Sequence, residues 1–324
     1  MGDFIQDPSA QDGLVERMEP ASAVPGIDWA GPTREEVAAL RRHPRFGEAM
    51  TASMRVPLDL YHGNRILNLI TNDRGRYILA IFALHLHYSR RPQDPGSGLT
   101  ATRLQTMCAE QGVCSFGRAG ALIRLLRWTG YLTDAPATQD RRVRLLMPTE
   151  RLFEIHRERW RRQLRAVALV RPEAQEALAQ FDHPAFHPAF TAGQVNEFLG
   201  GFRFYSYAPD IRLFAERNGG LFVLFGITMA GAADDTMPPT RAVPVSASAL
   251  AKRFHVSRTH VIGILRDAVE AGLLERPGPG NEFRMTPRLR EAAETMIATL
   301  HLFTAASARA ALAAVARASE AAWS

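Results

Sequence analysis

Lysine and cysteine are almost absent from this sequence of 324 residues. Lys252 is the only lysine, so the positive charge rests almost wholly on arginine. The only cysteines, Cys108 and Cys114, cannot build a disulfide framework, which excludes the small disulfide-stapled secreted proteins. The apolar fraction of 46% and the charged fraction of 22% are typical of a globular chain and exclude a wholly disordered one.

Segments that would direct the chain into or across a membrane are also lacking. The N-terminal sequence MGDFIQDPSAQDG is acidic and has no apolar core, unlike a signal peptide. The apolar runs YILAIFALHLHY and GGLFVLFGITMAGAA are too short to cross a bilayer, so we expect them to form buried helices. These absences predict a cytoplasmic protein.

Signatures of catalysis are missing as well. The sequence has no Walker loop, no GxGxxG and no GxSxG motif. His85 and His87 would point in different directions from a helix, because residues two positions apart do not share a face. His183 and His187 are separated by a proline. We therefore expect no enzymatic activity, no metal and no cofactor.

Positive charge is concentrated in one part of the chain. Residues 34–171 contain 24 arginines and 12 acidic residues, a net charge of +12. Residues 1–33 have a net charge of −5, and residues 172–324 have a net charge of −1. A basic region of this kind indicates a polyanionic partner such as nucleic acid, the alternative being a solvated basic surface.

An internal repeat divides the chain. Shifting the sequence by 144 residues places His43-Pro44-Arg45-Phe46 on His187-Pro188-Ala189-Phe190 and YILAIFAL on LFVLFGIT. The shift becomes 146 where Leu104 meets Leu250, and 142 where Ser115 meets Ser257. We predict an acidic, partly flexible segment, 1–33, and two modules, 34–171 and 172–324.

Each module is predicted to contain the same elements in the same order. A buried apolar helix leads to a short helix, a tight turn, a longer helix, a β-hairpin and closing helices. The expected ranges are 76–89, 100–110, 115–129, 132–147 and 149–180 in the first module, and 220–231, 246–254, 257–271, a hairpin from Leu273, and 287–323 in the second. The last range ends in an Ala-rich helix former.

The helix after each turn can be predicted residue by residue. Ser115 and Ser257 are good N-caps, and Gly130 and Gly272 stand where a helix ends at positive φ. Spacings of three and four residues define one buried face on each helix. Its residues are Ala119, Leu122, Ile123 and Leu126 in the first copy and Val261, Ile264, Leu265, Ala268 and Val269 in the second.

The sequence LIRLLRWTGYL followed by DRRVRLLMPTERL resembles the recognition helix and wing of bacterial winged helix-turn-helix regulators of the MarR type. The resemblance implies that the second helix enters the major groove of double-stranded DNA and that wing arginines reach the backbone or minor groove. The first wing, 132–147, has Asp140-Arg141-Arg142 at its tip, and Val143, Leu145 and Met147 are expected to face inward. The second wing, LLERPGPGNEFRMTP, is shorter and less basic.

The expected DNA contacts follow from these positions. Arginines on the helices can donate two hydrogen bonds to guanine or pair with a phosphate, and arginines on the wings act mainly on the backbone. The candidate residues are Ser115, Arg118, Arg124, Arg141, Arg142, Arg144, Ser257, Arg258, Thr259, His260, Arg266 and Arg284.

The resemblance also implies a function for the duplicated module. Regulators of this type are homodimers whose two recognition helices enter successive major grooves, about 34 Å apart. One chain with two modules could act as a monomeric pseudo-two-fold dimer whose closing helices pack together, although a true homodimer remains an alternative. The reading positions differ between the copies, with Phe116 opposite Arg258, so we expect unequal half-sites or reading by one half alone.

Two other functions remain open beside a transcriptional regulator located at the nucleoid. Plasmid-type replication initiators also carry tandem winged helices in one chain of this size. Alternatively, one or both modules serve as protein-interaction modules. We expect the aromatic run FRFYSY, 202–207, to pack in the core, the alternative being that it lines a ligand cavity. The sequence does not identify a small-molecule effector. We expect Cys108 and Cys114 to occupy positions in the core, the alternative being a thiol switch that disturbs DNA binding.

Overall fold

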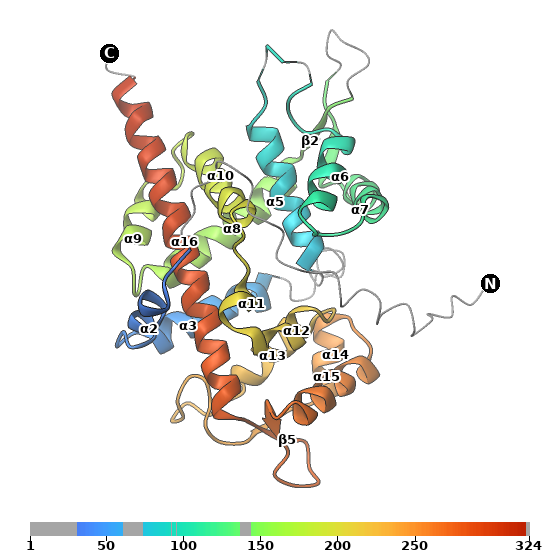
Figure 1. Cartoon of the computed structure of the whole chain (residues 1–324), viewed down its shortest axis with the longest axis vertical. Helices are drawn as coiled ribbons and strands as arrows, with labels where there is room; N and C mark the ends of the chain where they lie inside the picture. The colour runs from blue at the N-terminus through green and yellow to red at the C-terminus, as the bar shows by residue number, and fades with distance from the viewer. Residues whose placement is uncertain (1–30, 61–73, 92, 95, 137–143, 322–324) are drawn as a thin grey trace, which may run out of the picture.

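The computed structural model describes residues 31–60, 74–91, 93–94, 96–136 and 144–321 (Figure 1). Within these residues the chain is mainly helical, with small antiparallel sheets, which confirms the predicted fold class at this level. Residues 1–30 and the wing residues Arg141 and Arg142 lie outside the described residues, so the expectations placed on them stay predictions.

The first half of the chain contains eight elements in the described residues. They are α2 (Arg34–Arg41), α3 (Phe46–Leu60), α5 (Arg74–Tyr88), α6 (Ala101–Glu110), α7 (Phe116–Trp128), β1 (Leu132–Asp134), β2 (Leu146–Pro148) and α8 (Glu150–Val167). The strands β1 and β2 pair antiparallel and form the hairpin that follows α7.

The second half repeats this order with short additions. Its elements are α9 (Pro172–Ala179), α10 (Phe186–Leu199), α11 (Phe204–Tyr207), the 3₁₀-helix η2 (Pro209–Ile211), α12 (Arg212–Ala215), α13 (Gly220–Thr228), β3 (Val243–Pro244), α14 (Ala247–Phe254), α15 (Arg258–Glu270), β4 (Leu274–Glu275), β5 (Glu282–Met285) and α16 (Pro287–Ala321). Here β5 lies between β3 and β4 in a three-stranded sheet.

The start of the repeat lies four residues earlier in the second half than the sequence shift suggests. The Nδ1 atom of His43 accepts a hydrogen bond from the backbone N–H of Arg45 at 3.2 Å, just before α3. The Nδ1 atom of His183 accepts the same bond from Ala185 at 3.2 Å, just before α10. The match of His43 with His187 is therefore wrong. His187 lies within α10, and the sequence HPAFHPAF offered two equally good matches.

Equivalent threonines join each hairpin to its closing helix. The hydroxyl of Thr149 donates to the carbonyl oxygens of Gly130 at 2.7 Å and Tyr131 at 3.3 Å. The hydroxyl of Thr286 donates to those of Gly272 at 3.2 Å and Leu273 at 3.0 Å. Because each pair of acceptors lies where the longer helix meets the first hairpin strand, the same bond fixes the hairpin in both halves.

The predicted caps and buried faces of α7 and α15 are confirmed. The hydroxyls of Ser115 and Ser257 accept from the N–H groups three residues later, at 3.3 and 3.0 Å. Gly130 and Gly272 have φ of 74° and 68°. Every residue predicted for the two buried faces is buried except Val269, which is half-buried.

The inward positions predicted for the returning strand of the first hairpin are right for Leu145 and wrong for Met147. Leu146 and Pro148 are buried and Met147 is only half-buried, since Leu132 pairs with Pro148 in the ladder. Leu145 is buried because it forms a separate bridge with Thr100. Val143 lies outside the described residues.

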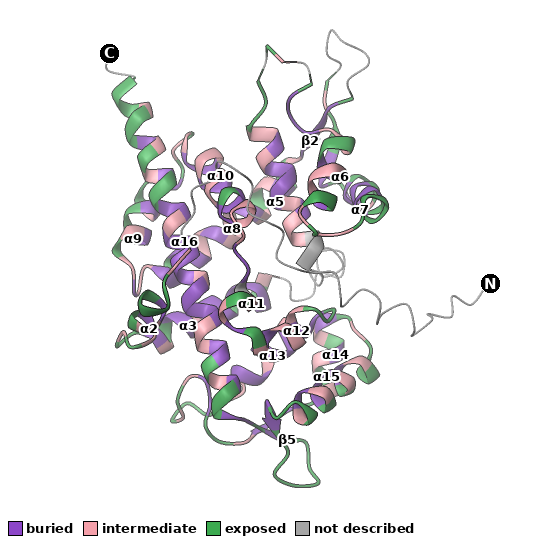
Figure 2. Cartoon of the chain, viewed as in Figure 1, coloured by how far each residue is buried: buried purple, intermediate pink, exposed green. Residues whose placement is uncertain are grey.

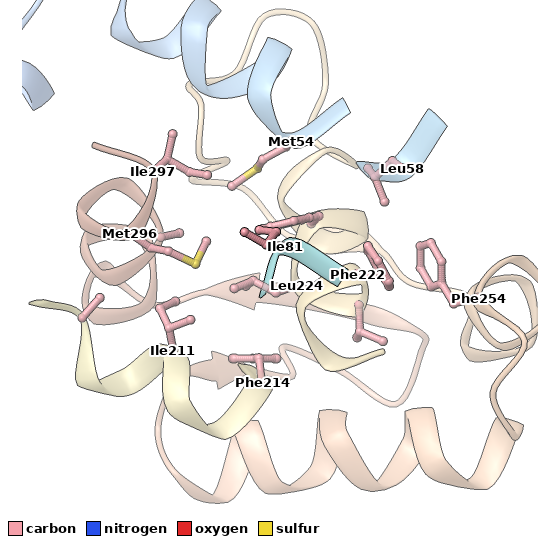
Figure 3. Packing of buried hydrophobic residues seen from close by; sticks show 14 of the residues in the cluster. Met54, Leu58, Ile81, Ile211, Phe214, Phe222, Leu224, Phe254, Met296 and Ile297 are labelled. Carbon is pink, nitrogen blue, oxygen red and sulfur yellow. The ribbon is translucent and has the colours of Figure 1, made fainter. Parts of the chain in front are cut away.

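The two halves do not have separate cores. One buried cluster includes residues from both, such as Met54 of α3, Ile81 of α5, Phe222 of α13 and Met296 of α16, which surround a common centre in Figure 3. The contacts are reciprocal: α3 packs on α8 and α13, whereas α10 packs on α16 and α5. The boundary at 171/172 thus separates repeated sequence, but the burial drawn in Figure 2 is continuous across it.

The closing segment of the second half is one helix, α16, which runs the length of the molecule in Figure 1. Among the described residues, α16 is long and apolar enough to cross a membrane, but 67% of its most apolar window is buried inside the protein. Its interior face contains polar groups with internal partners. His301, for example, is fully buried and its Nε2 lies 2.7 Å from Ser53 Oγ. We infer that α16 is a core helix.

Candidate nucleic-acid interface

Two exposed helix faces, on α7 and α15, contain most of the predicted DNA contacts. Figure 1 shows α7 above α15, with both helices on the right of α16. In each half the preceding helix packs against the longer one across a short turn. In the first half Gln105 Nε2 donates to the carbonyl oxygen of Phe116 at 3.1 Å, and a Cβ at Gly120 would lie 2.8 Å from that nitrogen. A side chain at position 120 would therefore displace the amide at the flexible end of the Gln105 side chain.

The outer face of α7 carries arginines and no acidic residue of the same helix. The helix contains no aspartate or glutamate between residues 116 and 128, and the side chains of Arg118 and Arg124 are exposed. In the described part of the chain Arg124 has no hydrogen-bond or ion-pair partner. At the end of the helix Arg127 pairs with Asp134 of β1 at 2.5 Å. Arg124 is therefore placed to pair with a partner outside the chain.

The first wing is described only at its base. Arg144 is exposed and lies two residues before β2, outside the residues that pair in the ladder. Arg141 and Arg142 belong to the part of the hairpin outside the described residues.

The first turn of α15 is less open than expected. Arg258 and Thr259 are exposed. His260, in contrast, is half-buried, and its Nε2 donates to the carbonyl oxygen of Asn218 at 2.8 Å. Because that ring nitrogen is already bonded to the protein, His260 positions α15 against the segment before α13.

The second arginine of α15 is engaged within its own helix. Arg266 donates to Oδ1 of Asp267 through Nε at 3.2 Å and Nη2 at 3.1 Å, and it lies 3.6 Å from Glu270. Arg217 pairs with the other oxygen of Asp267. Partial burial opposes ionisation of Asp267, but the hydrogen bonds from both arginines hold its pKa below the ordinary value.

The second wing also satisfies its arginines locally. Arg284 pairs with Glu275, its partner in the ladder, at 3.2 Å. Arg276 donates to the carbonyl oxygens of Pro279 at 3.1 Å and Gly280 at 3.0 Å, which closes the loop. The two halves therefore have the same order of elements, but they differ in how many arginine side chains pair with acidic or carbonyl groups of the chain itself.

Exposed apolar residues also lie on these helices, and of these only Phe116 was expected at a reading position. Trp128 at the end of α7 is 81% exposed, Phe116 at its start is 47% exposed, and Ile262 on α15 is 42% exposed. Their positions outside the buried face of each helix are the signal that the sequence offers.

The two thiols lie behind this surface. Cys108 is fully buried in α6, and burial raises its pKa to about 12, with the adjacent Cys114 adding to the shift. A thiol with such a pKa supplies almost no thiolate near neutral pH, which makes Cys108 a poor nucleophile. Among the described residues no group of three or more His, Cys, Asp or Glu side chains could hold a metal ion.

Comparison of the chain with protein-family models, with curated protein sequences and with solved structures finds no match.

Proposed function

We propose that this chain is a sequence-specific double-stranded DNA-binding protein that regulates transcription, with α7 and α15 as recognition helices. The observation that carries the proposal is the outer face of α7, where exposed arginines face solvent with no acidic residue on the helix. A helix N-capped by Ser115 and followed by a hairpin supports the proposal, because major-groove readers of the winged type use this order of elements.

The reciprocal packing of the halves supports a monomer that acts as a pseudo-two-fold dimer. In a symmetric dimer, each contact between unlike elements occurs twice, once in each direction. Here α5 of the first half packs on α10 of the second, and α13 of the second packs on α3 of the first. On this proposal the two modules are winged helix-turn-helix modules, and the recognition helices would reach major grooves about 34 Å apart.

The two modules are proposed to contribute unequally. Among the described residues Arg124 of α7 has no ion-pair partner, whereas Arg266 and Arg284 are paired with acidic residues in the second module. Breaking such pairs to contact DNA lowers the net gain in binding free energy, because the acids are left beside phosphate. We therefore expect the first module to supply most of the affinity.

One observation favours a second function for the second module, that of a protein-interaction module. Ile262 is 42% exposed in the middle of α15, on the face that would otherwise contact DNA. An apolar side chain surrounded by paired charges suits a protein surface better than a phosphate backbone.

Selection of bound fragments from sheared genomic DNA by the full chain, at about 150 mM salt, tests the proposal. Promoter-proximal fragments sharing one motif are expected, with stronger conservation in one half of the motif. Iterated sites beside a replication origin would instead support an initiator. Random or no fragments would contradict sequence-specific binding, and the Arg124→Ala variant serves as the control for recovery through α7.

A further inference from the structure

An exposed aromatic side chain stands at the N-terminal end of α7. Phe116 is the first residue of the helix, directly after the N-cap Ser115, and it is 47% exposed. Trp128 is 81% exposed, but it is the last residue of the same helix, about 18 Å away along the axis. Helix-turn-helix proteins contact base edges with the N-terminal residues of the second helix. Phe116 therefore lies at the end of α7 that would contact bases.

The backbone of Phe116 is held by two helices. The side-chain amide of Gln105 in α6 donates through Nε2 to the carbonyl oxygen of Phe116 at 3.1 Å. Ser115 Oγ accepts from the N–H of Arg118 at 3.3 Å and so caps the same turn. The helices α6 and α7 also pack against each other (Figure 1). The first turn of α7 is thus fixed by its own cap and by α6, which gives the phenyl ring a defined starting point.

The guanidinium of Arg124 lies toward the same end of the helix. Phe116, Gly120 and Arg124 are spaced four residues apart, so they follow one row along the helix surface. A Cβ at Gly120 would lie 3.7 Å from Nη1 of Arg124 and 2.8 Å from the Gln105 nitrogen that donates to Phe116. Glycine has no side chain, so the row has none between the phenyl ring and the Arg124 guanidinium.

The helix surface beside this row allows a flat partner to come close. A Cβ at Gly117 would have no atom within 4 Å, and the exposed Ala121 carries only a methyl group. The helix has no aspartate or glutamate that would repel phosphate. An apolar ring and a bidentate donor on one row match two features of the major groove, the methyl group of thymine and the O6 and N7 acceptors of guanine.

We propose that Phe116 contacts the C5 methyl group of a thymine adjacent to the guanine that Arg124 contacts. This inference rests on the proposed DNA-binding function and names part of its sequence specificity. The C5 methyl group distinguishes thymine in the major groove, and phenylalanine is one of the side chains that make apolar contact with it. Arg258 takes the equivalent position in α15, so the half-site of α15 has no counterpart of this thymine.

Replacing each thymine of the selected site in turn by deoxyuridine tests the inference, because the two bases pair alike and differ only in the C5 methyl group. Fluorescence anisotropy with the full chain should show one thymine whose replacement weakens binding about fourfold, which corresponds to ~0.8 kcal/mol for one buried methyl group. Phe116→Ala should bind the two duplexes equally, with unchanged circular dichroism because the residue is exposed. Phe116→Leu should keep part of the preference.

Replacing guanines by 7-deazaguanine, which lacks the N7 acceptor, locates the guanine of Arg124, since Arg124→Ala should not respond to that change. The sensitive thymine should be its neighbour. The matched control Trp128→Ala, at the other end of α7, should retain the full preference for thymine.

Wild-type binding that is unaffected by deoxyuridine at every position would overturn the inference, while the proposed function would stand because the chain still selects its site. A preference that persists in Phe116→Ala would also overturn it, because another residue would then contact the methyl group. Failure of the wild-type chain to select any DNA site would instead overturn the proposed function together with the inference.

Discussion

Arg266 donates two hydrogen bonds to the carboxylate of its chain neighbour Asp267, through Nε at 3.2 Å and Nη2 at 3.1 Å. The position equivalent to Arg266 in α7 is Arg124, whose helix has no acidic residue. One helix therefore neutralises its outward arginine and the other does not. This difference arises from two acidic residues of α15, Asp267 and Glu270, and it decides which substitutions should weaken DNA binding.

Arg124→Ala is expected to weaken binding to the selected DNA site by about ten- to a hundredfold, since one bidentate contact to a base contributes ~1–3 kcal/mol. Arg266→Ala should weaken it by less than about threefold, because Arg266 must first give up its pair with Asp267. Fluorescence anisotropy with a labelled duplex measures both. Arg317→Ala, an exposed arginine near the far end of α16, is the matched control, and equal effects of Arg124 and Arg266 would contradict the unequal halves.

Asp267→Asn should strengthen DNA binding. The change removes a negative charge from the outer half of α15 and releases both Arg266 and Arg217 from their ion pairs. Each additional phosphate contact steepens the dependence of log K on log salt concentration by about 0.9. Affinity measured between about 50 and 200 mM salt should show a steeper slope for the variant. A slope equal to that of the wild-type chain would place α15 away from DNA.

Thr149→Val and Thr286→Val should lower the free energy of unfolding by similar amounts, about 1 kcal/mol each, because each removes one hydroxyl that donates to the carbonyls at a helix–hairpin junction. Urea denaturation followed by circular dichroism measures the effect. Thr259→Val, at an exposed position, should change stability by less than about 0.5 kcal/mol. A large effect at only one of the two threonines would argue against structural equivalence of the halves.

Local features of the fold could be predicted from the sequence because short-range physics decides them. Ser257 caps α15 because a serine hydroxyl can reach the N–H three residues later, and Gly272 ends it because glycine accepts positive φ without strain. The buried faces follow from the spacing of Val261, Ile264 and Leu265.

Features that depend on long-range contacts could not be predicted. In the first hairpin, Leu145, Leu146 and Met147 are all apolar, so alternation does not define which residues face inward. The ion pair between Arg284 and Glu275 can be predicted only when the register of the two strands is known. The lack of a hydrogen-bond partner for the buried Gln194 amide depends on helices that pack around it from both halves. A repeated sequence predicts two similar units, but it does not show that they share one core.

Four buried groups should give the folded chain a maximum of stability near pH 6.5. Burial lowers the pKa of His156 and His301 from 6.5 to about 3, and burial lowers that of His187 to about 4. Below pH 6.5 the unfolded chain binds protons on these histidines that the folded chain does not, so stability falls as the pH falls.

Glu197 acts in the opposite direction. Burial raises its pKa from 4.5 to about 8, although a hydrogen bond from Ser307 opposes the shift. Between pH 4.5 and 8 the folded chain holds a proton that the unfolded chain has lost, so stability falls as the pH rises. Urea denaturation at about pH 5, 6.5 and 8 should show the maximum, and Glu197→Gln should remove the loss above pH 6.5. An unchanged loss in that variant would assign it to other groups.

Gln194→Leu should stabilise the chain. The amide of Gln194 is buried without a partner in the described residues, and replacing an unsatisfied polar group by an apolar one of similar size removes a penalty of about 1–3 kcal/mol. The free energy of unfolding should therefore rise in Gln194→Leu. If Gln194→Leu were instead less stable than the wild-type chain, the amide would have an internal structural role.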